Sequence, residues 1–177
     1  MSEDRKVAII TGSSQGLGAS IAIKLSQRNI NLVINYSNNK DMALKIKDEC
    51  VNNGVEAITV QADVSSDDDC KKLVQETINT FGKVDILVNN AGTTKFADHS
   101  KLDKLNDEDF INIYKVNVIG PYQMIRAVEP IMKENGFGSV VNISSIAGKT
   151  GIGSSIAYAA SKAVSYTHLT LPTKRIV

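Results

Sequence analysis

Short, almost continuously apolar runs alternate with longer segments of helical spacing along this chain, and that alternation constrains the fold most. The apolar runs are Val7–Thr11, Asn31–Tyr36, Ala57–Gln61, Ile86–Asn89 and Ser139–Ile143. The helical segments are 16–28, 39–53, 66–81 and 107–134. Strands without apolar–polar alternation are typical of sheets covered on both faces. The series therefore predicts an α/β fold, a doubly wound parallel sheet covered by helices.

The segment 66–81 carries the clearest helical pattern. One face collects its apolar residues, namely Cys70, Leu73, Val74, Thr77, Ile78 and Phe81. Ser66 and Asp69 have the spacing of a capping box, and Gly82 supplies a stop. The run 67–69 consists of three aspartates, which suggests a metal site. Successive helical residues point in different directions, however, and acids in a first turn simply suit the helix dipole, so we expect no metal there.

Composition excludes several classes of protein. The 177 residues are 42% hydrophobic and 22% charged, and 20 Lys+Arg against 19 Asp+Glu leave a net charge of +1. A basic field for nucleic acid or for an anionic membrane is therefore not supported. No window approaches the ~18 apolar residues of a membrane span, and the first residues lack a signal peptide. Two cysteines 20 positions apart, Cys50 and Cys70, fit a reducing compartment, so we expect a cytoplasmic protein.

A glycine-rich segment after the first strand predicts a site for an anion. Thr11-Gly12-Ser13-Ser14-Gln15-Gly16-Leu17-Gly18 leads from a strand into a helix. Its glycines let the backbone turn tightly and let a pyrophosphate approach the helix N-terminus, where free N–H groups favour negative charge. The spacing is G-x3-G-x-G rather than G-x-G-x-x-G, so taken alone the segment also suits a turn whose glycines serve only packing.

The same segment allows a different class of enzyme. Residues 12–16 match G-x-S-x-G, the nucleophile elbow of serine hydrolases, with Ser14 as the nucleophile. That chemistry needs a histidine base, and the chain has only His99 and His168. No segment resembling HGGG is present to form an oxyanion hole, so the hydrolase is the weaker alternative.

Residues after the second strand favour one dinucleotide over another. A dinucleotide site reads the adenosine ribose here, and an acidic residue selects NAD by accepting a hydrogen bond from the 2′-hydroxyl. Residues 35–40 contain no acid before Asp41, and Ser37, Asn38 and Lys40 suit a 2′-phosphate. NADP(H) is therefore favoured over NAD(H), although Gln15 is neutral where a basic residue would strengthen the preference.

Four more motifs follow in the second half. They are NNAG at 89–92, N-V-x-G at 117–120, Ser145 thirteen residues before a tyrosine, and YxxxK at 158–162. With the glycine-rich turn, they resemble the short-chain dehydrogenase/reductase family over residues 5–163. The resemblance implies a Rossmann-type sheet and an enzyme that moves hydride between a nicotinamide cofactor and a ketone or alcohol.

Geometry separates the YxxxK match from a second copy at 36–40. Tyr158 and Lys162 lie at i and i+4 of an expected helix and share a face, whereas Tyr36 ends a strand. Hydride reduction of a ketone needs a proton for the developing alkoxide. A tyrosine supplies it, and a neighbouring ammonium group favours the phenolate that remains. A serine hydroxyl holds the carbonyl.

The resemblance assigns roles to particular positions. It makes Tyr158 the general acid/base, Lys162 its partner and a ligand of the nicotinamide ribose, Ser145 the group that orients the carbonyl, and Asn117 the support of a proton-relay water. It assigns cofactor binding to Gly12, Ser14, Gln15, Gly16, Leu17, Gly18, Tyr36, Ser37, Asp63, Val64, Asn90, Ala91, Gly92, Tyr158 and Lys162. Asn89 is expected to stabilise the sheet, and 148–153 to form a flexible loop that touches substrate.

The character of the chain changes after Ala163. Residues 164–177 are rich in threonine and resemble the translated read-through of a sequencing-library adapter. We expect this tail to be non-native and residues 1–163 to be a Rossmann domain that is incomplete at its C-terminal end, because the family's sheet has seven strands and only five are present. The natural protein is then longer, and we expect the 177-residue chain to bury too little surface to fold stably or turn over substrate.

Within the family, the sequence is most like 3-oxoacyl-acyl-carrier-protein reductases, with sugar or polyol dehydrogenases as the alternative. The expected partner is a small carbonyl or alcohol substrate, including one bound to a carrier. The resemblance also implies a homodimer or homotetramer. A non-catalytic nucleotide-binding protein on the same fold is the alternative from another class.

Overall fold

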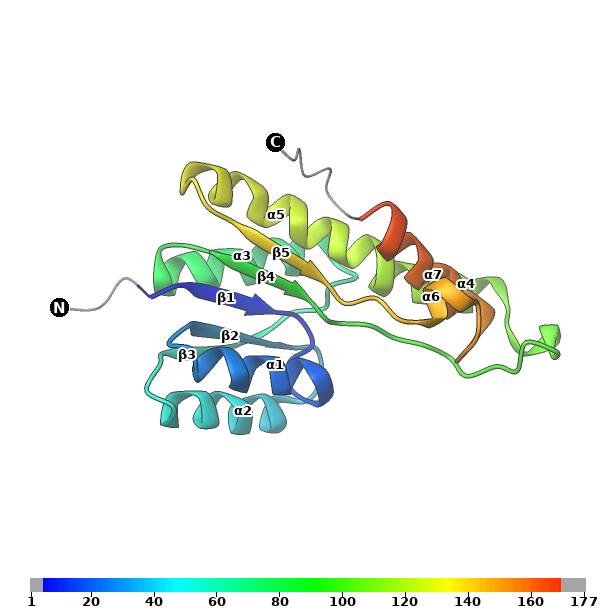
Figure 1. The fold of residues 1–177 in the computed structure, drawn as a ribbon, viewed down its shortest axis with the longest axis horizontal. Coiled ribbons are helices and arrows are strands. Elements are labelled where there is room, and N and C mark those ends of the chain that lie inside the picture. The colour runs from blue at the N-terminus through cyan, green and yellow to red at the C-terminus, as the bar shows by residue number, and fades with distance from the viewer. Residues whose placement is uncertain (1–4, 170–177) are drawn as a thin grey trace.

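The computed structural model describes residues 5–169 and contains one parallel sheet (Figure 1). Its order is β3-β2-β1-β4-β5. The strands are β1 (Val7–Ile10), β2 (Asn31–Tyr36), β3 (Ala57–Gln61), β4 (Ile86–Asn89) and β5 (Ser139–Asn142). All neighbouring strands pair in parallel. The predicted α/β fold is confirmed, and each strand lies within one residue of its predicted bounds.

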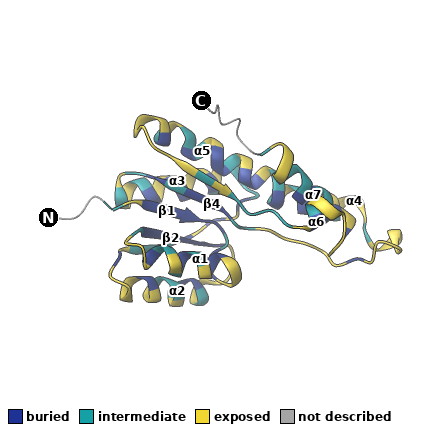
Figure 2. Ribbon diagram, viewed as in Figure 1, coloured by how far each residue is buried: buried dark blue, intermediate teal, exposed yellow. Residues whose placement is uncertain are grey.

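Helices cover both faces of the sheet. Helices α1 (Gly16–Ser26) and α2 (Lys40–Asn52) lie on one face, and α3 (Asp67–Phe81) and α5 (Gly120–Glu134) lie on the other (Figure 1). Successive strand residues face opposite sides, so Ile10 packs in one buried cluster and Ile9 in the other. Figure 2 shows the central strands as buried. This double burial explains their continuous Val, Ile and Leu content.

Helix α3 begins and ends with the predicted residues, but its predicted capping box is only half formed. The Ser66 hydroxyl accepts a hydrogen bond from the Asp69 N–H at 3.3 Å, and Gly82 ends the helix at φ +74°. The Asp69 carboxylate does not return to the Ser66 N–H. It accepts instead from the Asp63 N–H at 2.8 Å, because the chain before the helix folds back over its first turn.

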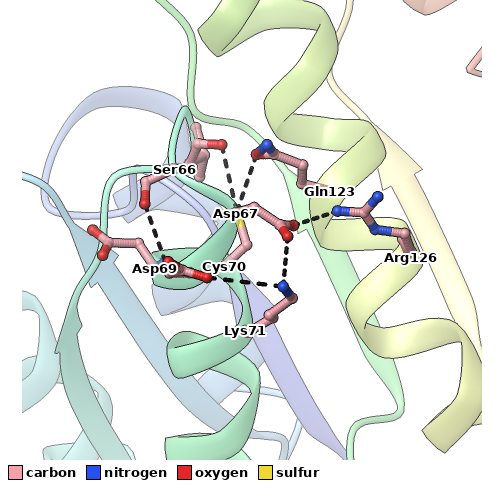
Figure 3. Close-up of polar contacts among 9 residues, drawn as sticks. Ser66, Asp67, Asp69, Cys70, Lys71, Gln123 and Arg126 are labelled. Carbon is pink, nitrogen blue, oxygen red and sulfur yellow. Dashed lines mark hydrogen bonds and ion pairs between the residues drawn. The ribbon is translucent and has the colours of Figure 1, made fainter.

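Of the three aspartates at 67–69, Asp67 contributes to packing between helices. Asp67 forms ion pairs with Lys71, one turn along α3, and with Arg126 on α5 (Figure 3). Hydrogen bonds from Lys71 and then Arg126 hold the pKa of Asp67 below its ordinary value. These cations account for the charge of Asp67, and no group of three potential metal ligands occurs within residues 5–169. Asp67 therefore braces α3 against α5.

The predicted helical run 107–134 is confirmed, but it contains a π-helical turn. It divides into α4 (Asp107–Tyr114), a π-helical turn η2 (Lys115–Ile119) and α5. The Gly120 N–H bonds to the Lys115 carbonyl in the wider i→i−5 pattern. Pro121 gives the physical reason, because in a regular α-helix its ring collides with the carbonyl of Asn117, four residues earlier. The turn directs Asn117 into the protein, where it is buried.

The carboxyl ends of the strands meet the remaining elements at one end of the molecule (Figure 1). These are η1 (Leu102–Lys104), α6 (Ala147–Thr150) and α7 (Ile156–Thr167). The expected loop at 148–153 begins inside α6, so its first part is a helical turn rather than a loop. The first residues of the expected non-native tail, 164–167, continue α7, and residues 170–177 lie outside the described residues.

The described residues contain neither a disulfide between the two cysteines nor a helix that could span a membrane. Cys50 and Cys70 are both buried and unpaired with each other. Among residues 5–169, the helices are all too short or too polar to cross a bilayer.

Candidate active site

A cleft of about 590 Å³ opens at the carboxyl ends of β1, β2, β3 and β4. Most residues expected to bind a cofactor line it: Gly12, Ser14, Gln15, Gly16, Tyr36, Ser37, Asp63, Val64, Asn90, Ala91 and Gly92. Leu17 is 56% exposed and Gly18 packs beneath the turn, so neither lines this cleft. A larger groove of about 970 Å³ between α5, β5 and α7 contains none of the expected site residues.

Two glycines are required by the shape of the turn. Gly12 has φ +60°, and a Cβ placed there would lie 3.0 Å from the Ala91 Cα. A Cβ on Gly18 would lie 2.7 Å from the Gly12 carbonyl oxygen and would collide with the Asn90 amide. The turn is thus packed so closely on the segment after β4 that only glycine fits, which leaves its upper side open to a ligand.

Asn90 braces the turn from below. Its Nδ2 donates to the carbonyls of Thr11 and Gly12 at 2.9 and 3.0 Å. The Thr11 hydroxyl in turn accepts from the N–H groups of Asn90 and Ala91, both at 3.0 Å. Thr11 was not among the predicted site residues, although it opens the TG motif. Asn89 bonds the Asn142 side chain across β4 and β5 at 2.9 Å, in agreement with its expected role in the sheet.

Asn35 is a second residue that the sequence prediction missed. It lines the cleft, yet its side chain is 2% exposed and bonds to the glycine-rich turn and to β3. The sequence does contain a signal for this role, because Asn35 is a polar residue near the end of a strand that is otherwise almost wholly apolar.

Two of the four expected catalytic residues, Asn117 and Lys162, adjoin the cleft, and a third, Tyr158, neighbours Lys162 on α7. Tyr158 and Lys162 lie one turn apart on α7, and the Lys162 Nζ is 5.9 Å from the centre of the Tyr158 ring. A Cβ on Gly92, which lines the cleft, would lie 3.4 Å from the Asn117 Oδ1 and 3.5 Å from the Lys162 Nζ. Asn117, Lys162 and the cleft therefore adjoin one another at Gly92.

The side chain of Asn117 is anchored on two sides. Its Oδ1 accepts from the Thr93 N–H at 2.8 Å, and its Nδ2 donates to the Thr93 carbonyl and to the Ser161 hydroxyl, both at 2.9 Å. Ser161 is itself on α7, and its hydroxyl donates to the Tyr158 carbonyl at 2.7 Å. Both amide donors of Asn117 are used within the protein, so the residue fixes the π-helical turn against the helix that carries Tyr158.

Ser145 lies on the segment between β5 and α6. Its hydroxyl accepts from the Ala147 N–H at 3.2 Å. The neighbouring Ser144 hydroxyl donates to the Lys162 carbonyl at 2.9 Å, and the Lys162 Nζ donates to the Ile143 carbonyl at 2.8 Å. These two bonds hold the segment that carries Ser145 against α7.

The hydrolase alternative lacks a base beside Ser14. His99 lines a separate cleft with residues of α6 and α7, and His168 bonds to Thr167 at the end of α7. Neither histidine is among the residues around Ser14 in the described part of the chain. The second YxxxK match also fails geometrically, because Tyr36 is buried in β2 and Lys40 is exposed at the start of α2.

Burial lowers the pKa of Lys162 below its ordinary value of 10.5, because the ammonium form loses water. The folded chain therefore holds this proton less tightly than the unfolded chain. The contribution of Lys162 to stability becomes more favourable as pH rises from the lowered pKa toward 10.5, and at neutral pH the charge opposes folding.

We expect Lys162→Met to raise the thermal midpoint at neutral pH by about 1–4 °C while abolishing turnover. A thermal melt followed across pH tests this, and the pH-dependent gain in stability should be smaller in the variant. Lys24→Met, at an exposed position, serves as the control. A lower midpoint for Lys162→Met would mean that the bond to Ile143 outweighs the cost of burying the charge.

Comparisons with known proteins agree with the observed fold. The family model for short chain dehydrogenases matches residues 6–171. A 3-oxoacyl-(acyl-carrier-protein) reductase from Staphylococcus epidermidis is 35% identical over 158 residues, which is 89% of this chain and 64% of that protein. The chain thus spans slightly less than two thirds of that relative.

Solved structures give the same match in three dimensions. A protein assigned to the short-chain dehydrogenases/reductases from Burkholderia xenovorans has a TM-score of 0.90 at 38% identity, covering 94% of this chain and 70% of that one. NAD+-bound xylitol dehydrogenase has a TM-score of 0.84 at 28% identity, and the match covers 92% of this chain and 62% of that one. An alcohol dehydrogenase from the archaeon Thermococcus sibiricus, complexed with 5-hydroxy-NADP, has a TM-score of 0.83 at 29% identity. The match covers 91% of this chain and 67% of that one.

Proposed function

This chain belongs to the short chain dehydrogenase family, and we propose that the whole protein is an oxidoreductase that interconverts a ketone and a secondary alcohol. The observation that carries the proposal is the junction at Gly92. There a cleft built on a glycine-rich turn ends beside Lys162, one helical turn from Tyr158. A dinucleotide site beside an acid/base pair is what hydride transfer to a carbonyl requires.

The residues divide the chemistry among them. A bound nicotinamide dinucleotide supplies the hydride, or accepts it in the reverse direction. Tyr158 gives its hydroxyl proton to the carbonyl oxygen as the new C–H bond forms, so the ketone gains two electrons and two hydrogens. Lys162 stabilises the phenolate that remains, and Ser145 orients the carbonyl. The backbone around Gly12 and Gly16 would receive the pyrophosphate, and Asp63 and Val64 would adjoin the adenine.

We infer that the cofactor is NADP(H). The solved relatives include one with NAD+ and one with an NADP derivative, so overall likeness does not choose between the two. The local residues favour NADP(H), because Ser37 and Asn38 line the cleft after β2 and no carboxylate precedes Asp41. A 2′-phosphate therefore meets hydroxyl and amide groups rather than a negative charge.

Ser37→Asp is expected to reverse this preference. A carboxylate at this position accepts from the ribose 2′-hydroxyl of NADH and repels the 2′-phosphate of NADPH, so the ratio of kcat/KM for NADPH to that for NADH should fall at least about tenfold. Steady-state rates with both cofactors measure the ratio. Ser37→Asn, which adds bulk without charge, is the matched control. A ratio that stays constant in the aspartate variant places the ribose elsewhere.

A 3-oxoacyl thioester, including one bound to a carrier protein, is the proposed substrate. The similarity to the staphylococcal reductase supports it. Exposed apolar side chains on the segments flanking the site support it as well: Phe96, Ile146 and Ile152 are 83%, 70% and 75% exposed. The Phe96 segment is held near α7 by a bond from the Ala97 N–H to the Ser154 carbonyl at 3.1 Å. Such side chains suit an acyl chain better than a polyol.

A panel of carbonyl substrates tests this proposal. The whole protein should oxidise NADPH with a 3-oxoacyl thioester and should be far slower with ketoses. The likeness to xylitol dehydrogenase makes a polyol the second candidate, and faster turnover of polyols with an oxidised cofactor would favour it. Tight binding of NADPH without turnover of any carbonyl would favour a non-catalytic nucleotide-binding protein instead.

A further inference from the structure

One buried amide joins two separate segments that line the cleft. The Asn35 Oδ1 accepts from the Gly12 N–H at 3.0 Å, at the start of the glycine-rich turn. Its Nδ2 donates to the carbonyls of Ala62 and Val60 at 3.0 and 3.3 Å. Ala62 immediately precedes Asp63, the first residue of the adenine end. The side chain thus spans from the turn after β1, across β2, to the end of β3.

The backbone of Asn35 strengthens the same connection. The Ser13 N–H donates to the Asn35 carbonyl at 2.9 Å, and the Asn35 N–H donates to the Ser13 hydroxyl at 3.1 Å. The Ser13 hydroxyl is itself oriented by donating to the Ile10 carbonyl at 2.7 Å. All of these groups are buried, so water does not compete for them. The glycine-rich turn is therefore fixed to β2 by side-chain and backbone bonds together.

We propose that Asn35 is a positioning residue, which sets the separation between the glycine-rich turn and the adenine end and so determines affinity for a complete dinucleotide. This proposal rests on the proposed function. A ligand that touches both segments at once binds well only when their separation is preset, because otherwise it must order them itself. A ligand that touches the adenine end alone does not depend on that separation.

Asn31 provides a matched control on the same strand. It lies at the opposite end of β2, away from the cleft, and is 8% exposed. Its Oδ1 accepts from the Glu56 N–H at 3.0 Å, which is the same kind of buried bond between neighbouring segments. Loss of this bond should weaken the fold as loss of the Asn35 bonds does, but it should not change the cleft.

The experiment compares Asn35→Ala, Asn35→Asp and Asn31→Ala in the whole protein. Asn35→Asp keeps an acceptor for the Gly12 N–H and loses the donors to Ala62 and Val60, so it uncouples the two segments with little change in volume. Binding is measured with NADPH and with adenosine 2′-monophosphate, which lacks the pyrophosphate. Thermal midpoints are recorded for each variant, and kcat is measured at saturating NADPH.

Both Asn35 variants should weaken NADPH binding at least about tenfold, which corresponds to about 1.4 kcal/mol, and adenosine 2′-monophosphate binding less than about threefold. Their kcat at saturating NADPH should stay within about twofold of wild type. Asn31→Ala should lower the midpoint and leave both affinities unchanged. Equal losses for the two ligands, or NADPH binding by Asn35→Ala that matches Asn31→Ala, would overturn the proposal. Failure of the wild-type protein to bind NADPH or NADH would instead overturn the proposed function.

Discussion

Tyr158→Phe is expected to lower kcat for carbonyl reduction by about a thousandfold. The change removes one hydroxyl, the group that supplies the proton to the carbonyl oxygen, and general acid catalysis by a positioned side chain contributes about 10²–10⁴-fold. The rate of NADPH oxidation under saturating substrate measures the effect in the whole protein.

The substitution should slow the chemical step without weakening cofactor binding. Tyr158 lies on α7, and its ring keeps its packing in the phenylalanine variant, so NADPH affinity should change by less than about threefold. Tyr122→Phe, at a 54% exposed position on α5, is the matched control and should keep full activity. A Tyr158→Phe variant that retains more than a tenth of the wild-type kcat would assign the proton to another group.

Gly18→Ala is expected to weaken NADPH binding by about 10–100-fold. The added Cβ would lie 2.7 Å from the Gly12 carbonyl oxygen and 2.9 Å from the Ser13 Cα, and it would displace the Asn90 amide. Relieving such overpacking costs about 1–3 kcal/mol, and here it moves the turn that faces the pyrophosphate. Fluorescence titration with NADPH measures the loss.

Gly82→Ala is the control for Gly18→Ala, because it introduces backbone strain at a glycine that does not line the cleft. Gly82 has φ +74° at the end of α3, with open space where a Cβ would be, so alanine costs about 1–2 kcal/mol of stability there. The thermal midpoint should fall and NADPH affinity should not change. If Gly18→Ala binds NADPH as tightly as Gly82→Ala does, the glycine-rich turn does not form the pyrophosphate site.

The strands and the first three helices follow from local pattern because each element satisfies one dominant requirement. A strand such as β1 must bury both faces, and a helix such as α3 must bury one. The period and length of the apolar pattern are therefore enough to predict each element. The glycine-rich turn was predictable for a similar reason, since no residue with a Cβ fits at Gly18.

The features that the sequence did not predict depend on how the segments pack against one another. The π-helical turn inside the helical run 107–134 follows from Pro121 together with the anchors of Asn117 on Thr93 and Ser161. The Asp69 carboxylate turned to Asp63 rather than to Ser66 because of the path of the preceding chain. Asn35 was missed because its partners Gly12 and Ala62 lie 23 and 27 residues away.

Transfer of labelled hydride tests the central claim most directly. The whole protein is given NADPH that carries deuterium at the transferable position of the nicotinamide C4, together with a 3-oxoacyl thioester, and the product is analysed by mass spectrometry. The account predicts one deuterium on the former carbonyl carbon of the 3-hydroxyacyl product and none in the Tyr158→Phe reaction over the same time. Product without deuterium at that carbon, or label found only in solvent, would contradict it.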